Sequence, residues 1–403
     1  MTSKLDKKLL LRMLFASVLL TLLSCSTASP PKTDNLTTAA SKSNAISFLR
    51  TGPWLPKLKP KNLDCSPQLK RSLQSGNLRQ SLNLLQHESS DDALLIKIDL
   101  LYQLGRWQEA LSLLENQQVH SPSFDIYRFI LLDAAGRNDE ALKLSATLKV
   151  NEHQTQAFET WKNALRELTK LNSDLTSQST KRVSLKFKAN SPAETALGPL
   201  KDDLHNFILK SSDFCNLNDA PHIKFMASSD LQDFEDIIWK PHNNKLNRLF
   251  GTVDISRVWL YVPPGNAPAK DSLSSLLYHE ASHIIAWRLT GINPQASWWV
   301  SEGFAEYLAL KGLGHKISIR SSKQDLISLL SGVDQPHPFC QNDHSLQNQY
   351  RHALDLFLIL EQSFGTDKII RFMHFFSQGL DTSQAFKASF GQSIAVFSKR
   401  LED

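Results

Sequence analysis

Residues 272–307, SLSSLLYHEASHIIAWRLTGINPQASWWVSEGFAEY, place two histidines and a glutamate at a spacing typical of a zinc site. His279 and His283 lie four positions apart, so a helix with 3.6 residues per turn presents both imidazoles on one face. Glu302 follows after eighteen intervening residues. Hydrolytic zinc sites often take three protein ligands, two His and one Glu, and leave a fourth position for water. The pattern therefore predicts a Zn²⁺ site formed by His279, His283 and Glu302.

The histidines fall in an expected helix from Ser272 to Thr290, with Asp271 as its N-cap and Gly291 at its end. Most of its other positions are apolar, so polar His and Glu side chains inside it need partners. Histidines satisfied by hydrogen bonds within a core are the alternative to a metal site. Glu302 makes this alternative the weaker of the two.

Glu280 is the candidate general base. It lies one residue after His279 and about 100° further around the helix, which places its carboxylate beside the ion instead of on it. From there it could take a proton from water that zinc has acidified, and no covalent intermediate with the protein is needed. Glu306, four residues after Glu302, is expected on the same side and is predicted to accept a hydrogen bond from a ligating imidazole. A surface carboxylate is the alternative for Glu306.

H-E-x-x-H followed after eighteen residues by E-G-x-A-x-Y resembles the gluzincin metallopeptidases, in particular the aminopeptidase-N family and the smaller bacterial peptidase MA-like domains. The resemblance extends to residues 348–365, where the family has a tyrosine that hydrogen-bonds the transition-state oxyanion at the head of a comparable helix. It implies this role for Tyr350 and a thermolysin-like domain around the site. A tyrosine packed at a helix start is one alternative, and His352 as the donor is another.

One motif of the aminopeptidases has no counterpart here. Those enzymes carry a Gly-Ala-Met-Glu-Asn stretch before the zinc helix, whose carboxylate binds the amino terminus of the substrate. No such stretch lies between Lys224 and Asp271, although the segment Gly251–Ser256 occupies a similar place. We therefore expect an endopeptidase, with an extended peptide substrate paired to an exposed strand next to the site.

The start of the chain resembles a bacterial lipoprotein signal. Basic residues precede an apolar run from Met13 to Leu23, which is short for a bilayer span, and LLSC follows at residues 22–25. Residues 1–24 are the predicted signal peptide and Cys25 the predicted lipidated residue. Ser26 resembles the residue found there in outer-membrane sorting, so we expect a lipid-anchored envelope protein facing the periplasm. A plain secretory signal is the alternative.

The remaining sequence before the catalytic region divides into two parts. Residues 25–61 are rich in Ser, Thr, Asn, Pro and Lys, as in a flexible linker. Residues 62–175 are predicted to be helical and repeat a glycine-containing turn at Gly76, Gly105 and Gly136, which resembles degenerate tetratricopeptide-like repeats. Such repeats offer a concave face to a peptide or a protein partner. A structural helical cap for the catalytic region is the alternative.

Composition and cysteine positions give weaker evidence about function than the motifs do. There are 45 basic and 40 acidic residues, and no Lys/Arg cluster interleaved with aromatics points to nucleic acid. Cys25 apart, three cysteines remain, and none has zinc-ligand spacing. In an oxidising compartment a Cys215–Cys340 disulfide is the preferred pairing.

The predicted fold class is α+β, mostly α, with a helical repeat region followed by a gluzincin catalytic domain at residues 180–403. We expect this domain to have a small mixed sheet and a helical lobe, with the metal in the cleft between them. Expected strands span 182–188, 222–226 and 258–262. Expected helices span 196–209, 231–239, 346–364, 368–376 and 394–401. The predicted function is a membrane-tethered zinc metallopeptidase acting on peptides or proteins; the alternative is a catalytically silent envelope scaffold that acts through its repeats.

Overall fold

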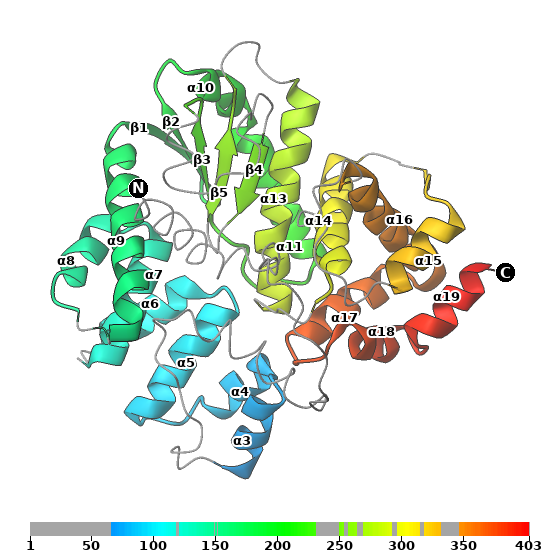
Figure 1. Cartoon of the computed structure of the whole chain (residues 1–403), viewed down its shortest axis with the longest axis horizontal. Coiled ribbons are helices and arrows are strands. Elements are labelled where there is room, and N and C mark those ends of the chain that lie inside the picture. Colours follow the sequence, from blue (N-terminus) through cyan, green and yellow to red (C-terminus); the bar gives the residue numbers. More distant parts are fainter. Residues whose placement is uncertain are drawn as a thin grey trace, which may run out of the picture.

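The computed structural model describes residues 66–402, apart from 118–120, 149, 151, 231–249, 254–256, 264–268, 292–295, 315–317 and 332–345. Helices predominate in this part of the chain, and one small mixed sheet accompanies them (Figure 1). The predicted α+β, mostly α class is therefore confirmed. The predicted signal peptide, Cys25 and the linker lie outside the described residues. None of the described helices is both long and apolar enough to cross a membrane.

The first helices follow one another in an arc along one side of the molecule, and each packs against the next (Figure 1). Their turns contain Gly76, Gly105 and Gly136, with φ of 71°, 66° and 73°. Glycine adopts this left-handed conformation without steric cost, which explains why it recurs at the turns. The helices are α3 (Pro67–Gln74), α4 (Leu78–Leu84), α5 (Asp91–Gln103), α6 (Trp107–Asn116), α7 (Pro122–Ala135), α8 (Asn138–Ser145) and α9 (Glu152–Ser173).

The sheet has five strands in the order β1-β2-β3-β5-β4. β2, β3 and β5 run parallel, and the outer strands β1 and β4 pair antiparallel with their neighbours. The three expected strands are confirmed to within two residues. β1 and β4 were not predicted. The sequence of β1, LTSQS, has no apolar alternation. The strands are β1 (Leu175–Ser179), β2 (Val183–Lys188), β3 (Ile223–Ser228), β4 (Phe250–Val253) and β5 (Arg257–Tyr261).

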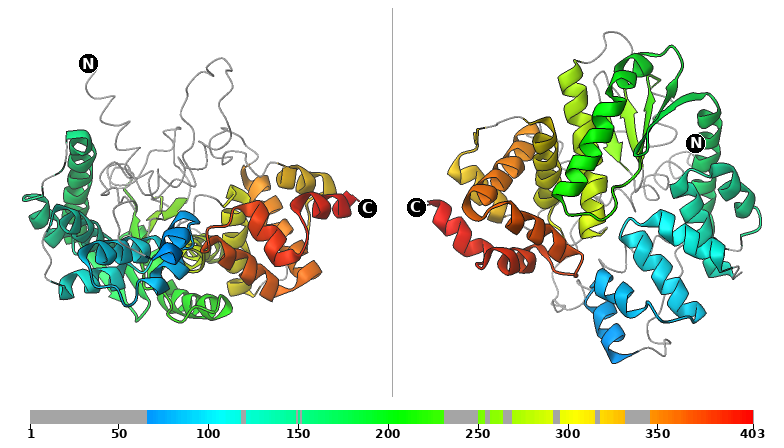
Figure 2. Two further views of the ribbon diagram at one scale, coloured as in Figure 1. Left: turned by 90° about the horizontal axis from the view of Figure 1, so that it is seen from below. Right: turned by 180° about the vertical axis from the view of Figure 1, so that it is seen from behind.

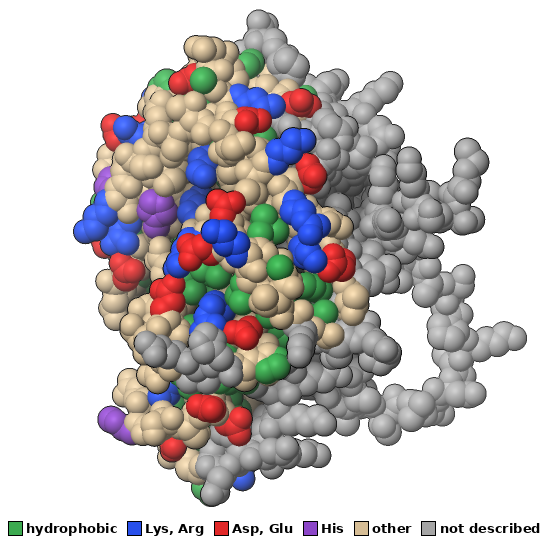
Figure 3. Space-filling model, turned by 90° about the vertical axis from the view of Figure 1, so that its left-hand side faces the viewer, with side chains coloured by type: hydrophobic (Ala, Val, Ile, Leu, Met, Phe, Trp, Pro, Cys, Tyr) green, Lys and Arg blue, Asp and Glu red, His purple; other side chains and the backbone are tan. Residues whose placement is uncertain are grey.

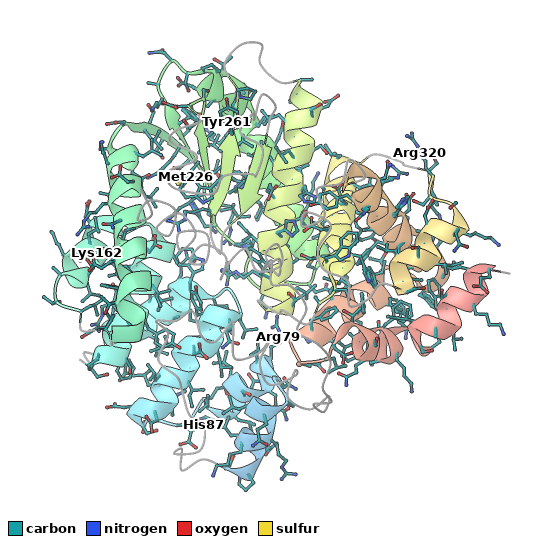
Figure 4. The ribbon with its side chains drawn as sticks, viewed as in Figure 1. Arg79, His87, Lys162, Met226, Tyr261 and Arg320 are labelled. Carbon is teal, nitrogen blue, oxygen red and sulfur yellow. The ribbon has the colours of Figure 1, made fainter. Side chains whose placement is uncertain are left out.

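The two faces of the sheet pack against different parts of the chain. Leu185, Phe225 and Val258 belong to the larger hydrophobic core, which includes α11 (Lys201–Phe214) and α13 (Lys270–Thr290). Figure 2, seen from behind, shows α11 across the back of the sheet. On the opposite face Met226 and Tyr261 join the core of the repeat helices (Figure 4). The sheet is therefore buried between the repeat region on one face and α11 and α13 on the other.

Two expected helices differ in their details. The expected helix 196–209 is two helices, α10 (Pro192–Leu197) and α11, joined by a 3₁₀ turn (Gly198–Leu200) where Gly-Pro interrupts the α-helical pattern. The zinc-motif helix α13 has Ala269 as its N-cap, so Asp271 was wrongly predicted as the cap and lies in the first turn. The predicted end of α13 at Thr290 was correct, and Gly291 follows it with φ 73°. The expected helix 231–239 lies outside the described residues.

Beyond α13 the described chain is helical, as predicted, and forms a separate lobe in Figure 1. α15 and α18 are additional to the predicted helices. The lobe contains α14 (Trp298–Leu313), α15 (Lys323–Ser331), α16 (Leu346–Phe364), α17 (Thr366–Phe376), α18 (Thr382–Phe390) and α19 (Ile394–Glu402).

The glycine turns of the repeats contact the rest of the molecule. A side chain at Gly76 would lie 3.4 Å from Gly379, in the turn between α17 and α18, and one at Gly105 would lie 3.4 Å from Arg288 of α13. Near Gly136, the Lys224 ammonium of β3 donates to the carbonyl of Ala135. One edge of the repeat region is therefore in contact with the sheet, α13 and the C-terminal lobe.

A buried ion pair adds to this contact. Arg257 of β5 lies 3.0 Å from Asp133 of α7, and both side chains are buried. The outer face of the repeats, by contrast, carries interleaved acidic and basic side chains, as Figure 3 shows. That mixture is typical of a solvated surface.

Cys215 does not form the expected disulfide. Its thiol is free and buried in the larger core just after α11, where burial raises its pKa to about 12. This corrects the Cys215–Cys340 prediction. Cys340 and Cys65 lie outside the described residues.

Candidate metal centre

The candidate site lies between α13 and α14, which pack against each other. α13 contributes His279, Glu280 and His283, and α14 contributes Glu302 and Glu306. The first three and Glu302 are between 4% and 8% exposed. Burying so many ionisable groups together is costly unless they neutralise one another or share an ion. The arrangement therefore requires a partner for these side chains.

Three atoms from these helices form a nearly equilateral triangle. The Nε2 atoms of His279 and His283 are 3.2 Å apart. Glu302 Oε2 lies 3.3 Å from His279 Nε2 and 3.4 Å from His283 Nε2. Zinc bonds of about 2.0–2.1 Å at tetrahedral angles would separate neighbouring ligand atoms by about 3.3–3.4 Å. The triangle therefore has the size of one face of a zinc coordination tetrahedron, and the residues fit Zn²⁺.

Glu306 contacts the other side of the first imidazole. Its Oε1 lies 3.1 Å from His279 Nδ1. A carboxylate at this nitrogen favours the tautomer with the proton on Nδ1, which leaves the Nε2 lone pair directed at the triangle. Ser301 Oγ lies 3.5 Å from Nδ1 of His283 and is the corresponding neighbour of the second imidazole. Ser301 was not predicted, although it directly precedes Glu302.

Gly303 explains how α14 comes close enough to α16. A Cβ at this position would lie 2.8 Å from the carbonyl oxygen of Ala353 and 2.8 Å from the ring of Phe357. Only a residue without a side chain permits this approach. The glycine therefore sets the distance between the helix that carries Glu302 and the helix that carries Tyr350. Sequence reasoning found the glycine only as part of the family motif, without this packing role.

Tyr350 is brought to the site. Its ring lies 6.1 Å from the ring of His279, centre to centre, at an angle of 23°. Burial, together with the carboxylates of Glu302, Glu280 and Glu306, raises its pKa well above the ordinary value of a phenol. Tyr350 therefore stays protonated and able to donate a hydrogen bond.

His352, the alternative donor, is held by other groups. Its Nδ1 lies 2.6 Å from Ser321 Oγ, and that hydroxyl donates its one hydrogen to Asp355 at 2.8 Å. Asp355 is fully buried and accepts from the backbone amides of Arg320 and Ser321 as well. These contacts use His352 to join α16 to the segment before α15, and Tyr350 is the better-placed donor.

The carboxylates and imidazoles of the site shift one another's pKa values. Burial raises the pKa of Glu280, and the neighbouring imidazoles only partly oppose this. A carboxylate with a raised pKa is a better proton acceptor at neutral pH. Burial disfavours the His279 cation, but Glu306 and Glu302 outweigh burial and raise its pKa well above the ordinary value. Both shifts follow from carboxylates and imidazoles confined in one buried site.

The structure thus brings together all the predicted site residues that it describes: His279, Glu280, His283, Glu302, Glu306 and Tyr350. His279, His283 and Glu302 form a group of His, Cys, Asp or Glu side chains whose ligand atoms can reach one ion. Cys25 lies outside the described part of the chain. Comparison of the chain with protein-family models, curated proteins and solved structures found no match in any of the three.

Proposed function

We propose that the protein is a zinc-dependent metallopeptidase of the gluzincin type. The single observation that carries this proposal is the triangle of His279 Nε2, His283 Nε2 and Glu302 Oε2, with edges of 3.2, 3.3 and 3.4 Å. Zinc held there would supply an acidified water and polarise the scissile carbonyl. The buried Glu280 is the group beside this triangle that a purely structural metal would not need.

The residues of the chain then have separate tasks. Glu280 takes the proton of the attacking water and returns it to the leaving amine. Tyr350 donates a hydrogen bond to the oxyanion that develops on the substrate carbonyl. Glu306 fixes the tautomer and orientation of His279. Burial of α13 and α14 excludes bulk water, which strengthens each of these interactions.

The substrate is proposed to be an extended peptide cut internally. β4 is an edge strand of the described sheet and packs against α13, so a peptide paired with it would run next to the site. This pairing needs no free amino terminus, which agrees with the missing Gly-Ala-Met-Glu-Asn stretch. Cleavage of peptides blocked at both ends tests this part of the proposal. Cleavage only of peptides with a free amino terminus would contradict it.

The decisive experiment compares the purified full-length chain with Glu280→Gln. Both should bind one zinc ion per chain, measured by elemental analysis, but Glu280→Gln should cleave a peptide library about 10²–10⁴-fold more slowly. The exposed Glu88→Gln is the matched control and should keep full activity. Zinc bound equally in all three without any cleavage would favour the envelope scaffold instead.

The cellular location is part of the same proposal and rests on the sequence. Lipidation of Cys25 would tether the enzyme to an envelope membrane, with the peptidase facing the periplasm. Incorporation of labelled palmitate that is lost in Cys25→Ser would support the tether. Equal labelling of both proteins would contradict it.

A further inference from the structure

A cavity of about 670 Å³ lies where the repeat region meets the C-terminal end of α13. Its walls come from α4, the start of α6, the segment after α11, the end of α13, and α17. None of the residues of the candidate metal centre lines it. The cavity is therefore a separate feature of the contact between the repeats and the catalytic region.

Four arginines from different segments line this cavity. They are Arg79 of α4, Arg106 just before α6, Arg288 of α13 and Arg371 of α17. Figure 4 shows Arg79 at the junction of α4 with α13 and α17. Guanidinium groups are planar and always charged, and they bind carboxylate and phosphate through paired hydrogen bonds.

The acidic side chains at the cavity neutralise only part of this charge. Glu109 pairs with Arg106 at 2.6 Å, and Asp219 pairs with Arg182, which does not line the cavity, at 2.9 Å. Asp367 is the one remaining acid among the described residues of the lining. Asp219 and Glu109 act on Arg288 only through longer-range attraction.

Arg79 is held by backbone oxygens and a hydroxyl instead of an acid. Its guanidinium donates to the carbonyls of Arg288 and Leu289, at 2.9 and 3.3 Å, and to Ser377 Oγ at 3.1 Å. These bonds orient Arg79 at the end of α13 without cancelling its charge. Its position is therefore fixed before any ligand binds.

The charges at this cavity are partly desolvated. Burial lowers the pKa of Arg288 and of Arg79. Arg106 lowers both further, while Asp219 and Glu109 act in the opposite direction on Arg288 without outweighing its burial. Burial and Arg79 also lower the pKa of His374, so this imidazole is neutral at physiological pH. A bound anion would relieve this crowding of like charges.

We propose that this cavity binds a small organic anion that carries phosphate or carboxylate groups. Arg288 and Arg371 supply the guanidinium groups, and the fixed Arg79 completes the positive wall. Leu217, Leu289 and Ile370 line the same cavity and can contact the apolar part of the ligand. The ligand would join the repeats, α13 and α17 at one point, about 7–8 Å along the helix axis from His283. This site does not depend on the proposed peptidase activity.

Calorimetric titration of the full-length protein at constant ionic strength tests this proposal. Inorganic phosphate is one probe and succinate is the other, so the two arms distinguish the anionic groups. At least one probe should bind saturably, and Arg288→Gln should weaken its binding about tenfold or more. Arg371→Gln should also weaken binding, and because Arg371 is exposed, this variant keeps the test valid if Arg288→Gln fails to fold.

Arg166→Gln, at an exposed position on α9, is the matched control and should bind like the wild type. Binding that is equal in the wild type, Arg288→Gln and Arg371→Gln would overturn the proposal, because the anion would then occupy another site, such as the metal centre. Absence of binding of both probes to the wild type would overturn it as well.

Discussion

Glu306 is the carboxylate next to the first imidazole of the site. Its carboxylate lies 3.1 Å from His279 Nδ1, on the side of the imidazole that faces away from the triangle. Carboxylates at this position raise the basicity of a ligating imidazole and lock its ring. Sequence spacing predicted this contact, because Glu306 follows Glu302 by one helical turn.

Glu306→Gln should therefore weaken zinc binding about 10–100-fold, while Glu88→Gln leaves it unchanged. The side chain of Glu306 is 30% exposed, so we expect little change in thermal stability. Competition with a chelating dye measures the affinity. Wild-type affinity in Glu306→Gln would mean that the imidazole is oriented by its packing alone.

The residue pattern predicted the triangle but only part of its surroundings. Two histidines at i and i+4 have a defined geometry on a helix, so His279 and His283 could be placed from the sequence alone. Ser301 and Arg79 could not be assigned in this way. Serine and arginine are common surface residues, and only the fold shows that these two lie against His283 and the end of α13.

Among the elements, α16 is fixed by one buried carboxylate. Burial by itself would raise the pKa of Asp355, but hydrogen bonds from Arg320 and Ser321 and the Arg351 guanidinium outweigh burial and lower it. The charged form is therefore favoured in the folded protein. Asp355 ties the segment before α15 to the helix that carries Tyr350.

Asp355→Asn should destabilise the protein by about 3 kcal/mol at pH 7, because charged hydrogen bonds are lost in a buried site. The folded pKa lies below the unfolded value, so the part of this contribution that comes from the charge is present above about pH 4 and is lost as the pH falls through the lower folded pKa. Urea unfolding at several pH values measures it. The exposed Asp271→Asn is the control, and a difference between wild type and Asp355→Asn that is constant down to pH 3 would contradict this explanation.

Element boundaries were predictable where the chain has strong local signals. Gly291 ended α13 as expected, because a glycine with positive φ stops a helix. The prediction of Asp271 as the N-cap was wrong, because Lys270 already belongs to the helix. β1 was not predicted because its sequence has no apolar pattern. Tertiary contacts determine where such elements begin, and the local sequence does not show these contacts.

At the scale of the whole molecule, the helices of residues 67–173 and the rest of the described chain share buried surfaces. The sequence predicted the glycine turns but not what they contact, since residues such as Gly76 and Gly379 are about three hundred positions apart. Leu78 N donates to the carbonyl of Ser377 at 3.0 Å in the same place. We expect the two regions to unfold together.

Gly379→Ala tests this contact against a matched control. Gly379 and Gly391 have φ of 82° and 76°, but a Cβ at Gly379 would overlap the backbone of Ser75, whereas nothing lies within 4 Å of one at Gly391. Gly391→Ala should cost only the strain of positive φ, about 1–2 kcal/mol. Gly379→Ala should cost about 2 kcal/mol more, measured by thermal unfolding. Equal losses of stability in the two variants would show that the repeats do not pack against this turn in solution.

The position of bound zinc is the most direct test of the central claim. Crystals of the zinc-loaded protein, measured on both sides of the zinc absorption edge, should show one anomalous peak about 2.0–2.2 Å from His279 Nε2, His283 Nε2 and a carboxylate oxygen of Glu302. A peak elsewhere, or a Glu302 carboxylate turned away from the paired imidazoles, would contradict it.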